Sequence, residues 1–159
     1  MYAHYRSPIG IIKVEAIENH ISSVVFLEEE VELILPETGL LKTAVDQLHQ
    51  YFAGKRSTFD FPVKQSGTEF QQQVWQEISK VDFGKTQSYA QLSAQFGNPL
   101  AIRAIASANG KNKLWIVVPC HRIIGTNGEL TGYAGGLWRK KWLLQHEAVV
   151  CGKAQTTLF

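Results

Sequence analysis

The sequence has only two cysteines, Cys120 and Cys151, among its 159 residues. Two cysteines so far apart favour free thiols over a disulfide framework, and they are too few for a cysteine-based zinc site. No apolar run approaches the roughly 20 residues that span a bilayer, and the first residues, Met1–Arg6, do not form the pattern of a signal peptide. We therefore expect a cytoplasmic protein without a membrane segment, a metal or a cofactor.

Charge is scarce in number but uneven along the chain. Charged residues make up 19% of the sequence and hydrophobic residues 45%, which is typical of a globular protein with one domain or two small lobes. Residues 1–79 hold 6 Lys/Arg against 11 Asp/Glu (net −5), whereas residues 80–159 hold 10 against 3 (net +7). This asymmetry indicates either that the second half binds a polyanion such as nucleic acid or that two lobes of opposite charge face each other.

The N-terminal third of the sequence predicts a sheet and one helix. Residues 1–35 are rich in β-branched residues interrupted by turn signals, so they predict a small antiparallel sheet. Apolar residues recur at helical spacing over residues 41–52 and predict a helix. Residues 55–66 predict a linker, with a short strand around Phe59 and Phe61.

The following segment predicts three short helices. Thr68 can cap a helix that carries Val74 and Trp75 on one face. Residues 88–96 and 100–108 predict two helices with a tight join, which is the pattern of a helix-turn-helix. The second of these is rich in alanine and therefore thin, so it can approach closely either a nucleic acid or another helix. A last helix is predicted over residues 137–148.

The run from Ile116 to Ile124 is the most informative stretch of the chain. It is apolar and predicts a buried strand, yet Cys120 within it is followed directly by His121 and Arg122. A nucleophilic cysteine needs a group that accepts its proton, because the thiolate is the reactive form. Neighbouring side chains of a strand point to opposite faces, so proton transfer from Cys120 to His121 requires a bridging water or a local break in the strand.

These residues carry a family resemblance. The motif Val118–Arg122 resembles the active-site signature of the O6-alkylguanine-DNA alkyltransferases. The resemblance extends over Gly67–Gln72, Val74-Trp75, Tyr89, Arg103, Ala108–Gly110, Asn112, Gly132–Gly136 and Leu144–Glu147. It implies a mixed α/β (α+β) fold. An N-terminal antiparallel sheet lobe resembling ribonuclease H (residues 1–65) would precede a C-terminal helical DNA-binding and active-site domain with a helix-turn-helix (66–150) and a tail (151–159).

The resemblance implies direct DNA repair. Cys120 would take the alkyl group from O6-alkylguanine in DNA and keep it as a thioether, which has no easy leaving group, so each molecule would act once. The resemblance also implies a relay from Cys120 through a water to His121 and Glu147. Tyr89 would offer its hydroxyl to the purine, and Asn112 would tie the helix-turn-helix to the active-site segment.

The resemblance further implies how DNA is bound. A base inside a duplex cannot reach a buried cysteine, so it must be flipped out. Arg103 would fill the vacated place from the minor groove of double-stranded DNA, and a glycine-rich loop would close on the flipped base. The expected DNA-binding residues are Arg103, Ala104, Ser107, Ala108, Tyr133, Ala134 and Gly135. We expect the protein to act as a monomer.

The last five residues form a separate motif. Gln155–Phe159 is similar to the glutamine-x-x-leucine-phenylalanine peptides that bind bacterial replication sliding clamps. The alternative is an ordinary tail that packs its Leu158 and Phe159 on the body of the protein.

Other readings of these residues stay open at this point. A non-catalytic lesion sensor would bind the damaged base without transferring its alkyl group. Sensors of that kind replace the nucleophilic cysteine, so the presence of Cys120 argues against this interpretation. A cysteine hydrolase would leave Arg103 and the alanine-rich helix unexplained, and a helix-turn-helix regulator would leave Cys120 and His121 unexplained. By position alone, Tyr89 is also compatible with a core aromatic and Glu147 with a surface carboxylate.

Overall fold

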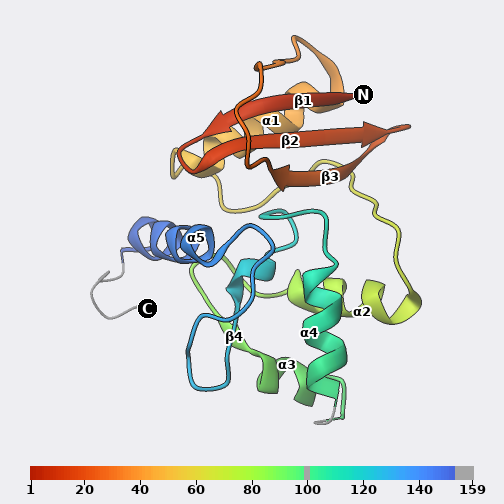
Figure 1. Cartoon of the computed structure of the whole chain (residues 1–159), viewed down its shortest axis with the longest axis vertical. Helices are drawn as coiled ribbons and strands as arrows, with labels where there is room; N and C mark the ends of the chain where they lie inside the picture. The colour runs from red at the N-terminus through yellow and green to blue at the C-terminus, as the bar shows by residue number, and fades with distance from the viewer. Residues whose placement is uncertain (99–100, 153–159) are drawn as a thin grey trace. The chain divides into compact units, whose positions relative to one another are not determined.

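The computed structural model describes residues 1–98 and 101–152, and these fall into two compact units (Figure 1). The first unit comprises Met1–Ser66 together with Lys113–Val117, and the second comprises Gly67–Asn112 and the chain from Val118 onward. The sequence predicts a single boundary between residues 65 and 66, whereas the structure returns the short segment Lys113–Val117 to the N-terminal unit.

The first unit is built on the predicted antiparallel sheet. Strands β1 (Tyr2–Ser7), β2 (Gly10–Ile17) and β3 (His20–Phe26) pair in chain order. The β1–β2 turn is closed by the Ser7 hydroxyl, which accepts from the Ile9 N–H and donates to the Gly10 carbonyl. Alternate side chains of these strands point inward, so the β-branched residues noted in the sequence form the core face.

Helix α1 (Gly39–Phe52) packs against this sheet, as Figure 1 shows. Its buried side chains are Leu41, Ala44, Val45, Gln47, Leu48, Tyr51 and Phe52, so the predicted helix is confirmed. The predicted strand around Phe59 and Phe61 is wrong. These rings instead pack in a row with Tyr51, and the nearest strand pairing is the isolated bridge between Ile21 and Val63.

The segment that returns to the first unit lies beside β3. The Val24 N–H donates to the Lys113 carbonyl (2.8 Å), and the Trp115 N–H donates to the Val24 carbonyl (2.9 Å). The Trp115 ring lies 6.0 Å from the ring of Phe26. These contacts fix the chain just before it enters the cysteine segment of the second unit.

The second unit begins with helix α2 (Glu69–Ile78), which Thr68 caps as predicted, and the Gln71 side chain completes a capping box. Gly67 is required before the cap because a Cβ there would lie 2.5 Å from the indole of Trp75. The same indole N–H donates to the Ala108 carbonyl (2.8 Å) and fastens α2 to α4 (Ile102–Gly110).

The remaining elements of the second unit surround the cysteine segment (Figure 1). Strand β4 (Gln87–Ser88) leads directly into α3 (Tyr89–Gln95), and Ser88 and Gln91 form a second capping box. Strand β5 (Ile123–Ile124) pairs with β4 in parallel, and α5 (Leu137–Val150) follows a glycine-rich loop. Helices α3 and α4 pack against each other close to the predicted positions.

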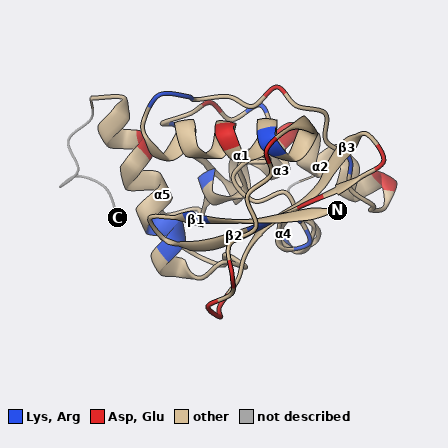
Figure 2. Cartoon of the chain, turned by 90° about the horizontal axis from the view of Figure 1, so that it is seen from above, with Lys and Arg blue, Asp and Glu red and all other residues tan. Residues whose placement is uncertain are grey.

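The distribution of basic residues is less one-sided at the surface than in the sequence. Figure 2 marks Lys and Arg on α5, where three basic residues are consecutive, Arg139 to Lys141. Arg139 and Lys140 are buried, and Lys141 is exposed. Arg122 is buried as well, so three of the ten cations of the C-terminal half serve the interior. Within residues 1–98 and 101–152, no helix has both the length and the apolar character needed to cross a membrane.

Candidate active site

The cysteine segment is a turn rather than the predicted strand. Ile116 has a positive φ of 73°, and Pro119 has ψ of 61°, so the backbone leaves the extended conformation twice. The Cys120 N–H donates to the Val118 carbonyl (2.7 Å) across Pro119, which forms an inverse γ-turn. Cys120–Arg122 then form a single 3₁₀ turn, in which the Arg122 N–H donates to the Pro119 carbonyl (2.9 Å). The apolar run predicted a strand because it is buried on all sides, but proline and the 3₁₀ turn prevent ladder pairing. The strand is therefore broken at Cys120, and this local break is compatible with a water that bridges the Cys120 thiol and His121.

Glu147 lies at the centre of a buried charge network. Its Oε2 lies 2.7 Å from Nε2 of His121 and accepts from Nη2 of Arg122 (3.0 Å). Its Oε1 accepts from Nε of Arg122 (2.8 Å) and from the Gly84 N–H (3.2 Å). Arg122 also donates from Nη1 to the Val81 carbonyl (2.7 Å). Glu147, His121 and Arg122 are all buried, with Glu147 only 1% exposed. The reading of Glu147 as a surface carboxylate is therefore wrong, and Arg122 is part of the network.

This network fixes the protonation of His121. Burial alone would raise the pKa of Glu147, but the charges and hydrogen bonds of His121 and Arg122 lower it, so the carboxylate stays ionised. Burial lowers the pKa of His121 despite the opposing attraction of Glu147, so the imidazole is neutral near pH 7. Because Nε2 faces a carboxylate, Nε2 carries the hydrogen, and Nδ1 keeps its lone pair. Nδ1 is buried and has no hydrogen-bond partner among the described residues, so it is available as a base.

Cys120 rests in its protonated form. Burial raises the pKa of its thiol to about 11, and a hydrogen bond from Asn112 and the positive charge of Lys140 offset this only in part. The Asn112 side chain also donates to the Val118 carbonyl (3.2 Å), so it connects the end of α4 to the turn. A buried thiol of this kind needs a proton acceptor at the moment of reaction, and His121 is the adjacent one.

Lys140 is a site residue that the sequence analysis missed. It is fully buried, and its Nζ donates to the carbonyls of Ile123 (2.6 Å), Thr131 (2.7 Å) and Gly132 (3.3 Å). It thereby joins the end of the cysteine turn to the glycine-rich loop. Burial lowers the pKa of Lys140 to about 8, against an attraction to Cys120 that raises it. Its position seven residues before Glu147, on the same helical face, is the signal that could have identified it.

Tyr89 lies at the first turn of α3 and is buried. The parallel pairing of β4 with β5 brings Tyr89 beside the chain that follows the cysteine turn. Its hydroxyl accepts a hydrogen bond of 2.9 Å from Nδ2 of Asn109, in the last turn of α4. Burial raises the pKa of Tyr89, and the hydrogen bond from Asn109 opposes that rise. The sequence analysis named Asn109 only within the range Ala108–Gly110 of the family resemblance and gave it no role.

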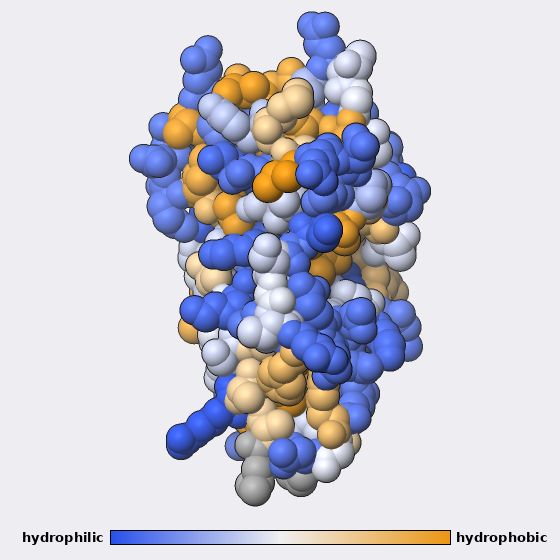
Figure 3. All heavy atoms as spheres, turned by 90° about the vertical axis from the view of Figure 1, so that its right-hand side faces the viewer, coloured by the Kyte–Doolittle hydropathy of each residue, from blue (hydrophilic) through white to orange (hydrophobic). Residues whose placement is uncertain are grey.

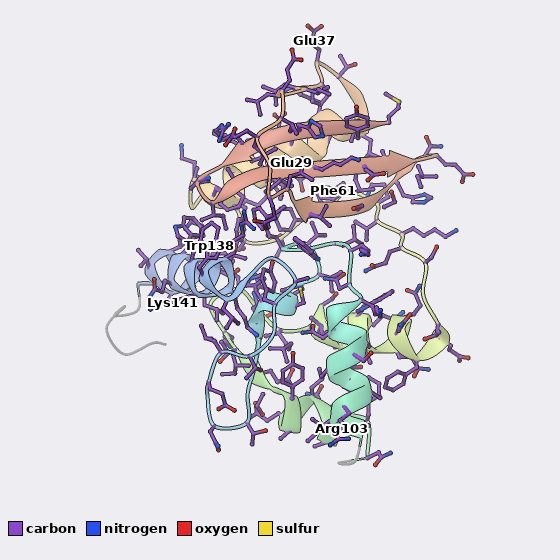
Figure 4. All side chains as sticks on the ribbon, in the orientation of Figure 1. Glu29, Glu37, Phe61, Arg103, Trp138 and Lys141 are labelled. Atoms are coloured by element: carbon purple, nitrogen blue, oxygen red, sulfur yellow. The ribbon has the colours of Figure 1, made fainter. Side chains whose placement is uncertain are left out.

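Helix α4 separates the predicted DNA-binding residues into two groups. Arg103, Ala104 and Ser107 are exposed along one side of the helix, and Figure 4 labels Arg103 near its N-terminal end. Ala108, one turn after Ala104, is 2% exposed, so its side chain is buried, and its contact with DNA stays a prediction. The exposed positions therefore combine one long cation with short side chains. On the face drawn in Figure 3, weakly hydrophobic residues gather among hydrophilic ones in the half that holds α2 and α4.

The glycine-rich loop is held at both ends by α5. Arg139 donates from Nη1 to the Gly135 carbonyl (3.0 Å), and the Gly136 N–H donates to the Tyr133 carbonyl (2.9 Å). Gly136 has φ of 93°, a conformation that favours glycine. Ala134 is exposed at the tip, Gly135 is buried, and burial raises the pKa of Tyr133 well above its usual value.

Other predicted features lie away from this cluster. Cys151 is an exposed free thiol, and Gln155–Phe159 falls outside the described residues. A surface pocket of about 470 Å³ lies among α2, the segment 80–87 and α3, and none of the predicted site residues lines it. The described part of the chain holds no group of three or more His, Cys, Asp and Glu side chains that could bind a metal.

The chain matches two family models that together cover residues 1–65 and 69–149. A model described as "6-O-methylguanine DNA methyltransferase, ribonuclease-like domain" matches residues 1–65, and one described as "6-O-methylguanine DNA methyltransferase, DNA binding domain" matches residues 69–149. Among curated proteins, a methylated-DNA–protein-cysteine methyltransferase of Mycobacterium tuberculosis is 42% identical over 151 residues, covering 91% of this chain and 92% of the relative. The constitutive protein of that name from Bacillus subtilis is 49% identical over 114 residues, covering 71% of this chain and 69% of the relative.

Solved structures agree with these matches. The crystal structure of Mycobacterium tuberculosis OGT in complex with DNA has a TM-score of 0.84 and 39% identity, covering 94% of this chain and 93% of that one. An O6-methylguanine DNA methyltransferase from Methanococcus jannaschii has a TM-score of 0.65 and 27% identity, covering 87% and 88%. Both the sheet lobe and the helical lobe are thus shared, and the chain belongs to the 6-O-methylguanine DNA methyltransferase family.

Proposed function

We propose that this protein repairs DNA directly by moving the alkyl group of O6-alkylguanine to Cys120 in one irreversible event. The observation that carries this proposal is the buried thiol of Cys120 beside His121, whose Nε2 is bound to the Glu147 carboxylate while Nδ1 keeps a free lone pair. This is the order of nucleophile, base and orienting carboxylate that activates a weak nucleophile. Family membership supports the same chemistry.

The transfer balances with the residues of the site. The Sγ of Cys120 forms a bond to the alkyl carbon while the bond from that carbon to the guanine oxygen breaks. The thiol proton passes through a bridging water to Nδ1 of His121, and Glu147 stabilises the imidazolium that results. The electron pair of the broken bond stays on the purine, where the O–H of Tyr89 meets the developing negative charge. The thioether has no leaving group, so the protein is spent.

Mass spectrometry of the intact protein tests this function. Equimolar protein and a duplex with one O6-methylguanine should give a mass gain of one methylene, and an undamaged duplex should give none. The absence of any gain with the damaged duplex would remove the proposal. Repeated turnover without a lasting gain would instead favour a cysteine hydrolase.

We propose that α4 enters the minor groove and that Arg103 fills the space left by the flipped base. Supporting this, Arg103 is an exposed long cation beside the short, exposed side chains of Ala104 and Ser107 on the same helix. Flipping a base costs a few kcal/mol, so Arg103→Ala should slow transfer from duplex DNA by about tenfold or more. Transfer from the free alkylated base should change little. Equal losses on both substrates would mean that Arg103 has no part in flipping.

We further propose that Gln155–Phe159 binds a bacterial sliding clamp. Support comes from the motif alone. In a pulldown with purified clamp, the full chain should be retained, whereas a chain ending at Ala154 and a variant with Leu158 and Phe159 both changed to alanine should not. Equal recovery of all three would exclude the clamp and favour a tail that packs on the protein.

We also propose that one molecule repairs one lesion as a monomer. Light scattering of the free protein should give the mass of a single chain, about 17.8 kDa. A mass of two chains at micromolar concentration would contradict this.

A further inference from the structure

The contact between α3 and α4 contains one buried polar pair, Asn109 and Tyr89. Asn109 is 6% exposed and Tyr89 is 9% exposed. The Asn109 Nδ2 donates to the Tyr89 hydroxyl oxygen at 2.9 Å. The other end of the amide is different, because Oδ1 of Asn109 is buried and has no hydrogen-bond partner among the described residues.

Because only the N–H side of the Asn109 amide has a partner, we infer that the role of this side chain is to donate a hydrogen bond to Tyr89. Burying an amide with half of its hydrogen-bonding capacity unmet lowers stability, and an apolar side chain of similar size would avoid that loss. A packing residue at this place in α4 would therefore be a leucine or a methionine. Because the phenol oxygen accepts from Asn109, the phenol hydrogen must point elsewhere, toward an acceptor outside this pair.

The position of Asn109 in the fold is consistent with a role in orienting the Tyr89 hydroxyl. It lies on the buried side of α4, whose exposed side carries Arg103, and Asn112 follows three residues later on the way to the cysteine turn. An N–H donor to a phenol oxygen also stabilises negative charge on that oxygen, which helps the phenol to give a hydrogen bond or a proton. Both effects prepare Tyr89 to act on the purine.

We propose that Asn109 is a positioning residue for the transfer reaction: it directs the O–H of Tyr89 toward the alkylated base. This inference rests on the proposed function, because Tyr89 must contact the purine. Asn109 itself touches neither the alkyl group nor Cys120, and it acts through Tyr89 alone. Replacing it should therefore matter only while the Tyr89 hydroxyl is present.

A double-mutant cycle on the single-turnover rate tests this dependence. Tyr89→Phe should slow transfer from the damaged duplex by about 100-fold, in the range of a lost general-acid contact. Asn109→Leu, which removes the donor, should slow it by about 10-fold or more. The combined variant should be no slower than Tyr89→Phe. Rates are divided by the fraction of molecules that become alkylated, so partial unfolding does not count. Ser93→Ala, which removes another buried hydrogen bond of α3, is the matched control and should keep the wild-type rate.

Asn109→Asp supplies a second readout that a purely structural residue would not move. Once ionised, the introduced carboxyl would accept the Tyr89 O–H and turn it away from the base. When protonated, it would donate as the amide does. The rate of this variant relative to wild type should therefore fall as pH rises through the pKa of the introduced carboxyl, which an NMR titration of the variant locates. This dependence should vanish when Tyr89 is Phe.

The outcomes separate the two claims. If the wild-type protein gains no alkyl group, the proposed function fails. If it does, but Asn109→Leu stays within twofold of its rate or multiplies the loss of Tyr89→Phe, only the positioning inference is overturned. A ratio for Asn109→Asp that stays flat across the measured pKa of the introduced carboxyl would also overturn it.

Discussion

The two units bury different kinds of side chain. Among the described residues, the first unit buries two polar side chains, Ser7 and Gln47, within an otherwise apolar core. The second unit buries eight: Ser93, Asn109, Asn112, His121, Arg122, Arg139, Lys140 and Glu147. A core of the first kind is stabilised by apolar burial, whereas buried charges stabilise little unless each is paired. The comparison teaches that the first unit is organised for stability and the second for chemistry.

The substitution Glu147→Gln, in the second unit, should have the largest effect and tests this difference between the units most strongly. The amide cannot neutralise Arg122 or stabilise an imidazolium at His121, both of which contact the carboxylate directly. By analogy with loss of the carboxylate in a triad, we expect single-turnover transfer to slow by about 10³- to 10⁴-fold. Unfolding should become easier by about 3–5 kcal/mol, because a buried cation is left unpaired. A rate within tenfold of wild type, measured by quenched-flow mass spectrometry, would show that Glu147 does not serve the base.

The corresponding change in the first unit is Ile12→Ala. Ile12 is fully buried in β2, so the cavity should lower the free energy of unfolding by about 2–5 kcal/mol. The transfer rate per folded molecule should stay at the wild-type value. Ile17→Ala, at an exposed position of the same strand, is the control and should change stability by less than about 0.5 kcal/mol. A loss of rate comparable to that of Glu147→Gln would abolish the distinction between the units.

Adjacent lysines of α5 offer a sharper comparison within the second unit. Lys140→Met leaves three carbonyls without their donor, the one of Ile123 buried and those of Thr131 and Gly132 partly buried. We expect a loss of about 1–3 kcal/mol in chemical denaturation together with slower transfer. Lys141→Met alters an exposed residue beside it and should change unfolding by no more than about 0.5 kcal/mol. Equal effects of the two substitutions would mean that the buried ammonium does not hold the glycine-rich loop.

Acid should lower the free energy of unfolding through His121 and Glu147, and we expect this to be the smallest of the predicted effects. The pKa of His121 is lowered from its ordinary value of 6.5, so below pH 6.5 the unfolded chain takes up a proton that the folded chain resists. The pKa of Glu147 is lowered from 4.5, so below pH 4.5 its ionised pairing is lost in the same direction. Stability should fall as pH drops through each window, by at most about 1.4 kcal/mol per pH unit and group. In Glu147→Gln, the fall in unfolding free energy below pH 4.5 should lose the contribution of this carboxyl. If urea titrations gave the same pH dependence for the variant and the wild type, this fall would not come from Glu147.

The sequence predicted the regular elements well and the site only in part. The sheet, α1 and the cap of α2 at Thr68 were predicted because each depends on a local pattern. The capping boxes of α2 and α3 became visible only in the structure. The cysteine turn was mistaken for a strand because burial gives an apolar run whether or not the backbone pairs. The roles of Lys140 and Asn109 were missed because their partners, backbone carbonyls and a phenol, are distant in sequence and no local pattern reveals such pairs.

The central claim is that Cys120, and not the exposed Cys151, receives the alkyl group once. The direct measurement is peptide mapping after reaction with a tenfold excess of duplex that carries O6-methylguanine. One methyl group per chain, entirely on the peptide containing Cys120, is the predicted result. Methyl groups on Cys151, or release of more than one repaired guanine per protein molecule, would contradict the account.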